Sequence, residues 1–241
     1  MNTPVHVLAA ALACAAGPLQ AQATCQAHGG PTVPTVVELY TSEGCSSCPP
    51  ADRWLTQRQS GPGVIALAFH VDYWDRLGWP DRYASPAYTQ RQRQWQHRLG
   101  LGFVYTPQVV LDGEDRKDWH RITRLPGPGA ALADASLRRL AAGTYEAEIR
   151  PHAGAPALGA YWAVTEDGHR TTVKAGENDG ATLHHDAVVR HYRELPMRSA
   201  HAGATQHFTL QVPPGERARR VVLVVHDAAT GRPVQAVSLG C

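Results

Sequence analysis

Residues 35–50 read TVVELYTSEGCSSCPP and carry the features from which the fold can be predicted. The first seven of them are rich in β-branched and aromatic residues, which predicts a buried β-strand. A turn with Cys45 and Cys48 follows. Pro49 and Pro50 can then occupy the first turn of a helix, where a missing N–H costs little. The stretch therefore predicts a strand-to-helix junction that carries a C-x-x-C motif.

A C-x-x-C at such a junction indicates thiol–disulfide exchange. The free N–H groups and the macrodipole at a helix N-terminus favour a thiolate over a thiol. We expect Cys45 to be an exposed, easily ionised nucleophile. We expect Cys48 to resolve the mixed disulfide formed with a protein or a small-molecule thiol or disulfide substrate.

Two other interpretations of the motif remain open. In the first, the protein is a non-catalytic binding module and the cysteine pair is a structural disulfide. In the second, His70 joins the two thiolates as a ligand of a soft ion such as copper. The chain has no second C-x-x-C and no C-x-x-H to complete a conventional metal site, so we expect no metal. The sequence implies no organic cofactor either.

The rest of residues 24–142 alternates between strand and helix patterns. The apolar run at 64–71 predicts a second strand buried on both faces. Ser85 and Pro86 predict the start of a helix that ends near residue 99, and a short strand is expected at 109–111. Alanine, leucine and arginine at 130–142 predict a further helix. This order indicates an α/β domain.

Residues 143–241 differ from the first part of the chain. Short apolar or alternating runs are separated by turn signals such as Asn178-Asp179-Gly180 and Pro213-Pro214-Gly215. This spacing predicts a small antiparallel, sandwich-like β domain. The expected fold class is therefore α/β, with a separate β-rich domain at the C-terminus.

Three segments resemble a known family. They are ELYTSEGCSSCPPAD (38–52), FHVDYWDRLGWPDRYASPAYTQRQ (69–92) and VYTPQVVLDG (104–113). They are similar to the bacterial exported family called domain of unknown function 1223 (DUF1223), which is assigned a thioredoxin-like fold. The resemblance implies a thioredoxin-like domain over residues 24–142.

The thioredoxin-like fold also suggests a role for Thr106 and Pro107. A Thr-Pro dipeptide before a short strand would hold a cis peptide bond that faces the C-x-x-C. Pro107 would then shape the docking surface, and Thr106 would offer backbone hydrogen bonds to an extended substrate. Residues 42–44 and 46–47 differ from those of thioredoxin, so the analogy does not indicate the direction of the redox reaction.

Three polar residues are candidates for proton transfer. Glu38 lies in the middle of the first strand, and burial there would raise its pKa and let it accept the proton of Cys48. The alternative is a carboxylate at a polar surface or paired with an arginine. His70 and Asp72 close the second strand at the edge where α/β sheets place their active sites, although we favour structural roles for both, with Asp72 capping a turn. Trp74, Trp79 and Tyr83 either line a substrate groove or form a packed aromatic loop.

The N-terminus predicts export. Residues 7–16 form an apolar run too short to span a bilayer, and Ala21-Gln22-Ala23 offers small residues for cleavage, so 1–23 is expected to be a signal peptide. The mature chain would then reside in the periplasm or outside the cell, where disulfides persist. Cys25 and Cys241 are expected to join the two ends of the mature chain. The alternative is that each is free or pairs with another molecule.

Composition excludes several other classes of protein. The hydrophobic fraction is 43% and the charged fraction 18%, which is typical of a globular chain and not of a disordered one. A formal net charge of +2 does not indicate a nucleic-acid or membrane-surface partner. No segment of the mature chain reaches the length of a membrane span. The sequence does not indicate an oligomeric state.

Overall fold

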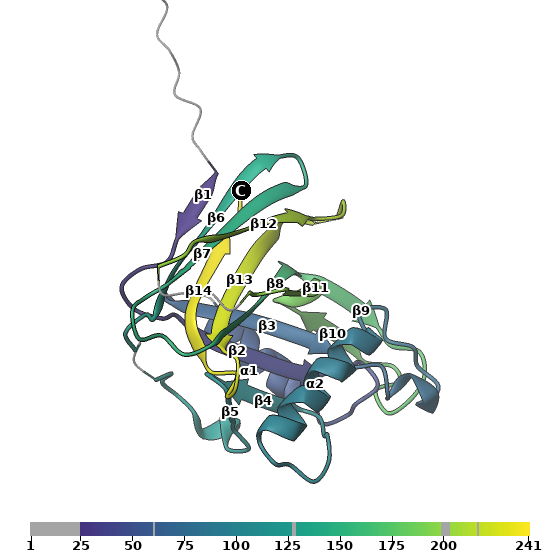
Figure 1. Ribbon diagram of the computed structural model, residues 1–241. Coiled ribbons are helices and arrows are strands. Elements are labelled where there is room, and N and C mark those ends of the chain that lie inside the picture. Colours follow the sequence, from purple (N-terminus) through teal and green to yellow (C-terminus); the bar gives the residue numbers. More distant parts are fainter. Residues whose placement is uncertain (1–24, 60, 127–128, 199–202, 216) are drawn as a thin grey trace, which may run out of the picture.

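The computed structural model describes residues 25–59, 61–126, 129–198, 203–215 and 217–241. These residues form two α-helices, two short 3₁₀ helices and fourteen strands (Figure 1). The expected α/β class, with a thioredoxin-like domain followed by a β domain, is therefore wrong, because the described chain is predominantly β. The expected signal peptide, residues 1–23, lies outside the described residues.

The largest unit is an eight-stranded sheet. In spatial order its strands are β14 (Pro233–Leu239), β13 (Arg219–Asp227), β8 (Leu158–Glu166), β11 (Val188–Leu195), β3 (Val64–His70), β2 (Thr35–Thr41), β4 (Gln108–Leu111) and β5 (Glu114–Asp115). Strands β2 and β3 are parallel, and β11 joins β3 in parallel where Val188 lies opposite Ala68. The N-terminal and C-terminal parts of the chain thus share one sheet.

Two helices cover opposite faces of β2 and β3. Helix α1 (Pro49–Gln59) packs Trp54 and Leu55 on the face that holds Leu39, whereas α2 (Pro86–Arg98) packs Trp95 on the face that holds Tyr40. In Figure 1, α2 lies in front of the sheet and α1 behind it. Alternate residues of β2 point to opposite faces, so both faces of this strand are buried. The 3₁₀ helices are η1 (Asp75–Leu77) and η2 (Trp119–Arg121).

A second sheet has four strands and packs beside the large one. Its strands, in spatial order, are β1 (Gln26–His28), β6 (Ala133–Ala141), β7 (Thr144–Pro151) and β12 (Gln206–Gln211). Leu137 and Ile149 of this sheet contact Trp162 and Leu223 of the large sheet in one apolar cluster. A two-stranded ribbon, β9 (His169–Thr172) and β10 (Thr182–His185), extends toward α1.

The prediction of a helix at 130–142 is wrong, because this segment contains strand β6. Ala133, Ala135 and Leu137 are buried at every second position, while the residues between them are more exposed. Backbone pairing with β1 on one side and β7 on the other replaces the helical hydrogen bonds. Helix propensity is a weak preference that such tertiary pairing overrides. The expected domain boundary at 142–143 falls in the turn between β6 and β7, which are paired neighbours.

A disulfide joins Cys25 to Cys241, and so links the start of the described chain to its last residue. The two cysteines are separated by 216 positions in the sequence. The bond holds the segment before β1 next to the end of β14. Among the described residues, no helix is both long and apolar enough to cross a membrane.

A buried ion pair connects the two parts of the large sheet. The Glu38 carboxylate of β2 accepts hydrogen bonds from Arg91 of α2, at 2.9 Å from Nε and 2.5 Å from Nη2. It also accepts from Tyr40, Trp95 and Tyr161, the last of which lies on β8. Burial alone would raise the pKa of Glu38. The charge of Arg91 and these hydrogen bonds outweigh that effect and hold the pKa below its ordinary value.

We expect Arg91→Met to lower the free energy of unfolding by about 3–5 kcal/mol, because it leaves the Glu38 charge buried without its partner. The double variant Glu38→Gln/Arg91→Met should lose less than the two single variants added together. Arg138→Met, which breaks the exposed pair with Glu146, is the matched control and should change little. Urea denaturation of the wild type, the two single variants, the double variant and the control measures these changes, and an Arg91→Met chain as stable as the control would contradict the expectation.

The same ion pair sets a pH dependence. Since the pKa of Glu38 is lower in the folded chain than in the unfolded one, the pair contributes its full stability above about pH 4.5. That contribution is lost as the pH falls through the folded pKa. Wild-type protein should therefore lose more stability in acid than Glu38→Gln, which denaturation midpoints at a series of pH values would reveal.

Candidate active site

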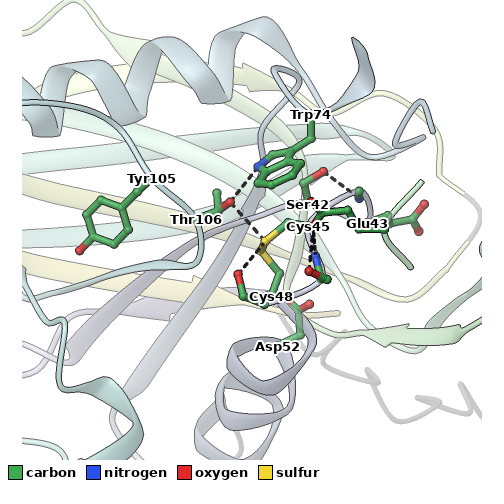
Figure 2. The surroundings of a disulfide bond; sticks show 12 residues. Ser42, Glu43, Cys45, Cys48, Asp52, Trp74, Tyr105 and Thr106 are labelled. Atoms are coloured by element: carbon green, nitrogen blue, oxygen red, sulfur yellow. Dashed lines mark hydrogen bonds between the residues drawn. A yellow bond between two sulfur atoms is a disulfide. The ribbon is translucent and has the colours of Figure 1, made fainter. Parts of the chain in front are cut away.

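A disulfide between Cys45 and Cys48 closes the turn that leads from β2 into α1 (Figure 2). Cys48 directly precedes the helix, and its carbonyl accepts hydrogen bonds from the N–H groups of Ala51 and Asp52 at 2.8 and 3.1 Å. Pro49, which has no N–H, occupies the first position of α1. The expected strand-to-helix junction is present, with the cysteine pair at the start of the helix.

Two hydroxyl groups approach the sulfur of Cys45. Thr106 Oγ1 donates to Cys45 Sγ at 3.3 Å, and Ser47 Oγ lies 3.3 Å from the same sulfur. The indole N–H of Trp74 donates to Thr106 Oγ1 at 2.8 Å, which directs the threonine proton toward the sulfur (Figure 2). The peptide bond between Thr106 and Pro107 is cis. The structure therefore places Thr106 against the cysteine pair, with Pro107 next to it.

The expectation of an exposed sulfur at position 45 is wrong. Both Cys45 and Cys48 have 0% relative exposure. Trp74 packs closely over the turn, since a Cβ atom built on Gly44 would lie 3.2 Å from the Trp74 Cβ. The sequence indicated that Trp74 belongs to an aromatic loop. Its packing over the C-x-x-C turn is visible only in the folded structure.

A cluster of buried titratable groups lies next to the C-x-x-C turn. His70 Nδ1 lies 2.7 Å from Asp81 Oδ2, and both side chains are fully buried. His185 lies between two carboxylates, with Nε2 at 3.4 Å from Glu43 Oε1 and Nδ1 at 3.8 Å from Asp52 Oδ2. These groups come from β3, β10, α1 and the loops after β2 and η1. The cluster is therefore assembled from distant parts of the chain.

Burial and charge set the proton occupancy of this cluster. Burial alone would lower the pKa of His70, but the charge of Asp81 and the hydrogen bond to it raise the pKa above its ordinary value. Burial alone would raise the pKa of Asp81, and His70 reverses that effect so that the pKa is lowered. For Asp52, burial dominates the nearby histidines, and its pKa is raised. Asp52 therefore holds its proton to a higher pH than an exposed aspartate does.

The other predicted proton-transfer residues lie elsewhere. Glu38 points to the α2 face of the sheet, and its pKa is lowered instead of raised, so the proposed role as proton acceptor for Cys48 has no structural basis. Pairing with an arginine, the alternative interpretation, is what the structure shows. Asp72 accepts a hydrogen bond of 2.5 Å from Thr89 of α2 and so connects this loop to the helix.

Four residues of the buried cluster were not predicted from the sequence: Glu43, Asp52, Asp81 and His185. Asp81 lies within a segment quoted for its family resemblance, but its partner His70 is eleven residues away. His185 stands among several histidines without regular spacing, and no local pattern distinguishes it. Among the residues that the structure describes, the grouping with metal-ligand spacing is Glu146, Glu148 and His207 on the four-stranded sheet. It includes neither cysteine of the motif.

We expect Asp81→Asn to lower the pKa of His70, because the anion that most strongly opposes the effect of burial is removed and only the smaller effects of Asp52 and Glu43 remain. It should also cost about 1–3 kcal/mol of stability, since Asp81 accepts from the Glu43 and Tyr83 N–H groups. In the wild type, the His70 contribution is full below the unfolded pKa and is lost as the pH rises through the folded pKa. NMR titration of the histidines measures the shift.

Asp134→Asn is the matched control for this experiment. Asp134 pairs with His152 at 3.0 Å, but both side chains are largely exposed. This control should leave the His70 titration unchanged. A His70 pKa that is the same in wild type and Asp81→Asn would contradict the assignment.

Comparisons with known proteins agree with the described architecture. The crystal structure of a protein from Agrobacterium tumefaciens is similar, with a TM-score of 0.60 and 26% sequence identity. The similarity covers 86% of this chain and 94% of the other. No curated protein matches the chain at a significant level. A family model described as "Protein of unknown function (DUF1223)" matches residues 36–226, which include the C-x-x-C turn, the Thr106-Pro107 segment and most of the large sheet; the chain therefore belongs to the DUF1223 family.

Proposed function

We propose that this protein is a thiol–disulfide oxidoreductase that acts through Cys45 and Cys48 on a protein or small-molecule partner. The observation that carries the proposal is the hydrogen bond from Thr106 Oγ1 to Cys45 Sγ, in a disulfide placed directly before α1. Donors aimed at a sulfur stabilise it as a thiolate, and the N-terminus of a helix does the same. Of the two sulfurs, Cys45 is therefore the better nucleophile and Cys48 the resolving thiol.

The reaction proceeds in two exchanges. In the reduced protein, the Cys45 thiolate attacks a partner disulfide, forms a mixed disulfide and expels one partner thiolate. Cys48 then attacks Cys45 Sγ, the mixed disulfide breaks, and the second partner thiolate leaves. Two electrons pass from the cysteine pair to the partner, and the two protons of the cysteine thiols end on the two partner thiols. The reverse sequence oxidises a partner dithiol.

Access to the pair requires a movement of the residues around it. Both sulfurs are buried, and Trp74 and Thr106 lie against the turn. A partner sulfur must reach Cys45 in line with the bond that breaks, so these side chains must shift before each exchange. The observed exchange rate is therefore the rate of the open site multiplied by the fraction of time that the site is open.

Burial of both sulfurs also favours the second candidate, a binding module in which the pair is an inert structural disulfide. The two functions differ in one measurable property. An exchanging pair is reduced by dithiothreitol while the chain remains folded, whereas an inert one is reduced only under conditions that unfold the protein.

Export to the periplasm or the cell exterior is part of the proposal. Two disulfides, Cys25–Cys241 and Cys45–Cys48, support an oxidising compartment. The signal pattern in residues 1–23 supports the same location. Detection of the mature N-terminus in a periplasmic or secreted fraction would test this location.

We expect the wild-type protein to catalyse reduction of insulin by dithiothreitol. Cys45→Ser should reduce the rate to the uncatalysed level, because the nucleophile is lost. Cys48→Ser should trap a mixed disulfide, because the resolving thiol is lost. The double variant Cys25→Ser/Cys241→Ser is the control and should retain catalysis at a temperature where it is folded. A wild-type pair that dithiothreitol reduces only on unfolding would overturn the proposal in favour of the structural disulfide.

A further inference from the structure

The loop between β9 and β10 contacts the C-x-x-C turn from the C-terminal part of the chain. Glu177 Oε2 accepts hydrogen bonds from the backbone N–H of Ser46 at 3.0 Å and from its hydroxyl at 2.8 Å. The side-chain amide of Asn178 donates to the carbonyl oxygens of Glu43 and Cys45, at 2.8 and 3.0 Å. Two neighbouring residues of one loop thus contact three residues of the turn.

The loop is shaped to present these two side chains. At its base, the N–H of Val173 donates a hydrogen bond to the carbonyl of Ala181. The N–H of Ala181 donates to the carbonyl of Asn178 and so closes a turn within the loop. Gly176 has a φ of 77°, which glycine adopts readily, and a Cβ there would be 3.4 Å from Trp79. The loop therefore packs against the same segment that carries Trp74, and its position is held independently of the contacts to Ser46.

The charge of Glu177 acts against a thiolate at Cys45. Ser46 directly follows Cys45, so its backbone N–H lies in the turn that the disulfide closes. Glu177 occupies this N–H and adds a negative charge beside the turn. A nearby like charge disfavours the charged form of a group, so it raises the pKa of a thiol and destabilises the reduced, ionised pair.

We infer that the β9–β10 loop tunes the cysteine pair: Glu177 makes the disulfide harder to reduce by disfavouring the Cys45 thiolate, and Asn178 holds the turn closed. This inference rests on the proposed thiol–disulfide exchange and assigns a positioning role to a loop from the C-terminal part of the chain. Stabilising the reduced form of such a pair makes it a stronger oxidant. Glu177 has the opposite effect and makes the reduced pair a stronger reductant.

The test compares Glu177→Gln with Asp179→Asn in equilibrium with reduced and oxidised glutathione. Glutamine keeps an oxygen that accepts from Ser46 but removes the charge, whereas Asp179 is a neighbouring acid of the same loop. We expect the equilibrium constant for reduction of Glu177→Gln to rise about 2- to 5-fold, which is the size of an exposed charge interaction. The thiol of Cys45 should ionise at lower pH, as followed by thiolate absorbance. Asp179→Asn should show a distinctly smaller change in both measurements.

Asn178→Ala tests the closing contact separately, because it changes no charge. We expect faster reduction by dithiothreitol and a smaller change in the equilibrium constant than in Glu177→Gln. Equal behaviour of wild type, Glu177→Gln and Asn178→Ala in an exchanging protein would overturn the inference and leave the proposed function intact. Failure of every variant, and of the folded wild type, to exchange with glutathione would overturn the proposed function itself.

Discussion

The ion pair between Glu38 and Arg91 is the constraint around which the large sheet is arranged. Glu38 lies in the centre of β2, with all of its hydrogen-bond donors on one face of the sheet. Arg91 faces the ring of Tyr161 at 3.9 Å and donates to the Tyr192 hydroxyl, so it also contacts β8 and β11. A buried charge left without its partner is strongly destabilising, so these strands and α2 must pack in one arrangement.

The same strand arrangement determines which segments surround the cysteine pair. Because β2 is held against both β3 and β4, the turn after β2 and the segment before β4 lie at the same end of the sheet, where Thr106 contacts Cys45. Strand β11 joins the edge of β3, which brings the β9–β10 ribbon over the same end. Glu177 and Asn178 can therefore contact a turn that lies more than 130 positions earlier in the chain. The C-terminal strands complete the site and are not a separate appendage.

Several local features could be predicted because neighbouring residues decide them. TVVELYT forms β2, the apolar run at 64–71 forms β3, and Ser85 caps α2 by accepting from the Ala87 N–H. The helix expected at 130–142 failed for the opposite reason. Ala133, Ala135 and Leu137 also fit a strand buried at every second position, and only pairing with β1 and β7 selects that alternative. The burial of Cys45 was not predictable either, since Trp74, which packs against the neighbouring Gly44, lies in a loop distant in the sequence.

From residue order alone, the C-x-x-C at a strand-to-helix junction and the family could be inferred, because both depend on residues close together along the chain. The joining of the two parts in one sheet, the pairing of Glu38 with Arg91 and the cluster of His70, Asp81 and His185 depend on contacts between remote segments. Such contacts form only when burial of many side chains offsets the entropy of bringing the segments together. A short sequence motif contains no information about this balance between burial and entropy. The surroundings of Cys45 and Cys48 were therefore decided by the tertiary structure.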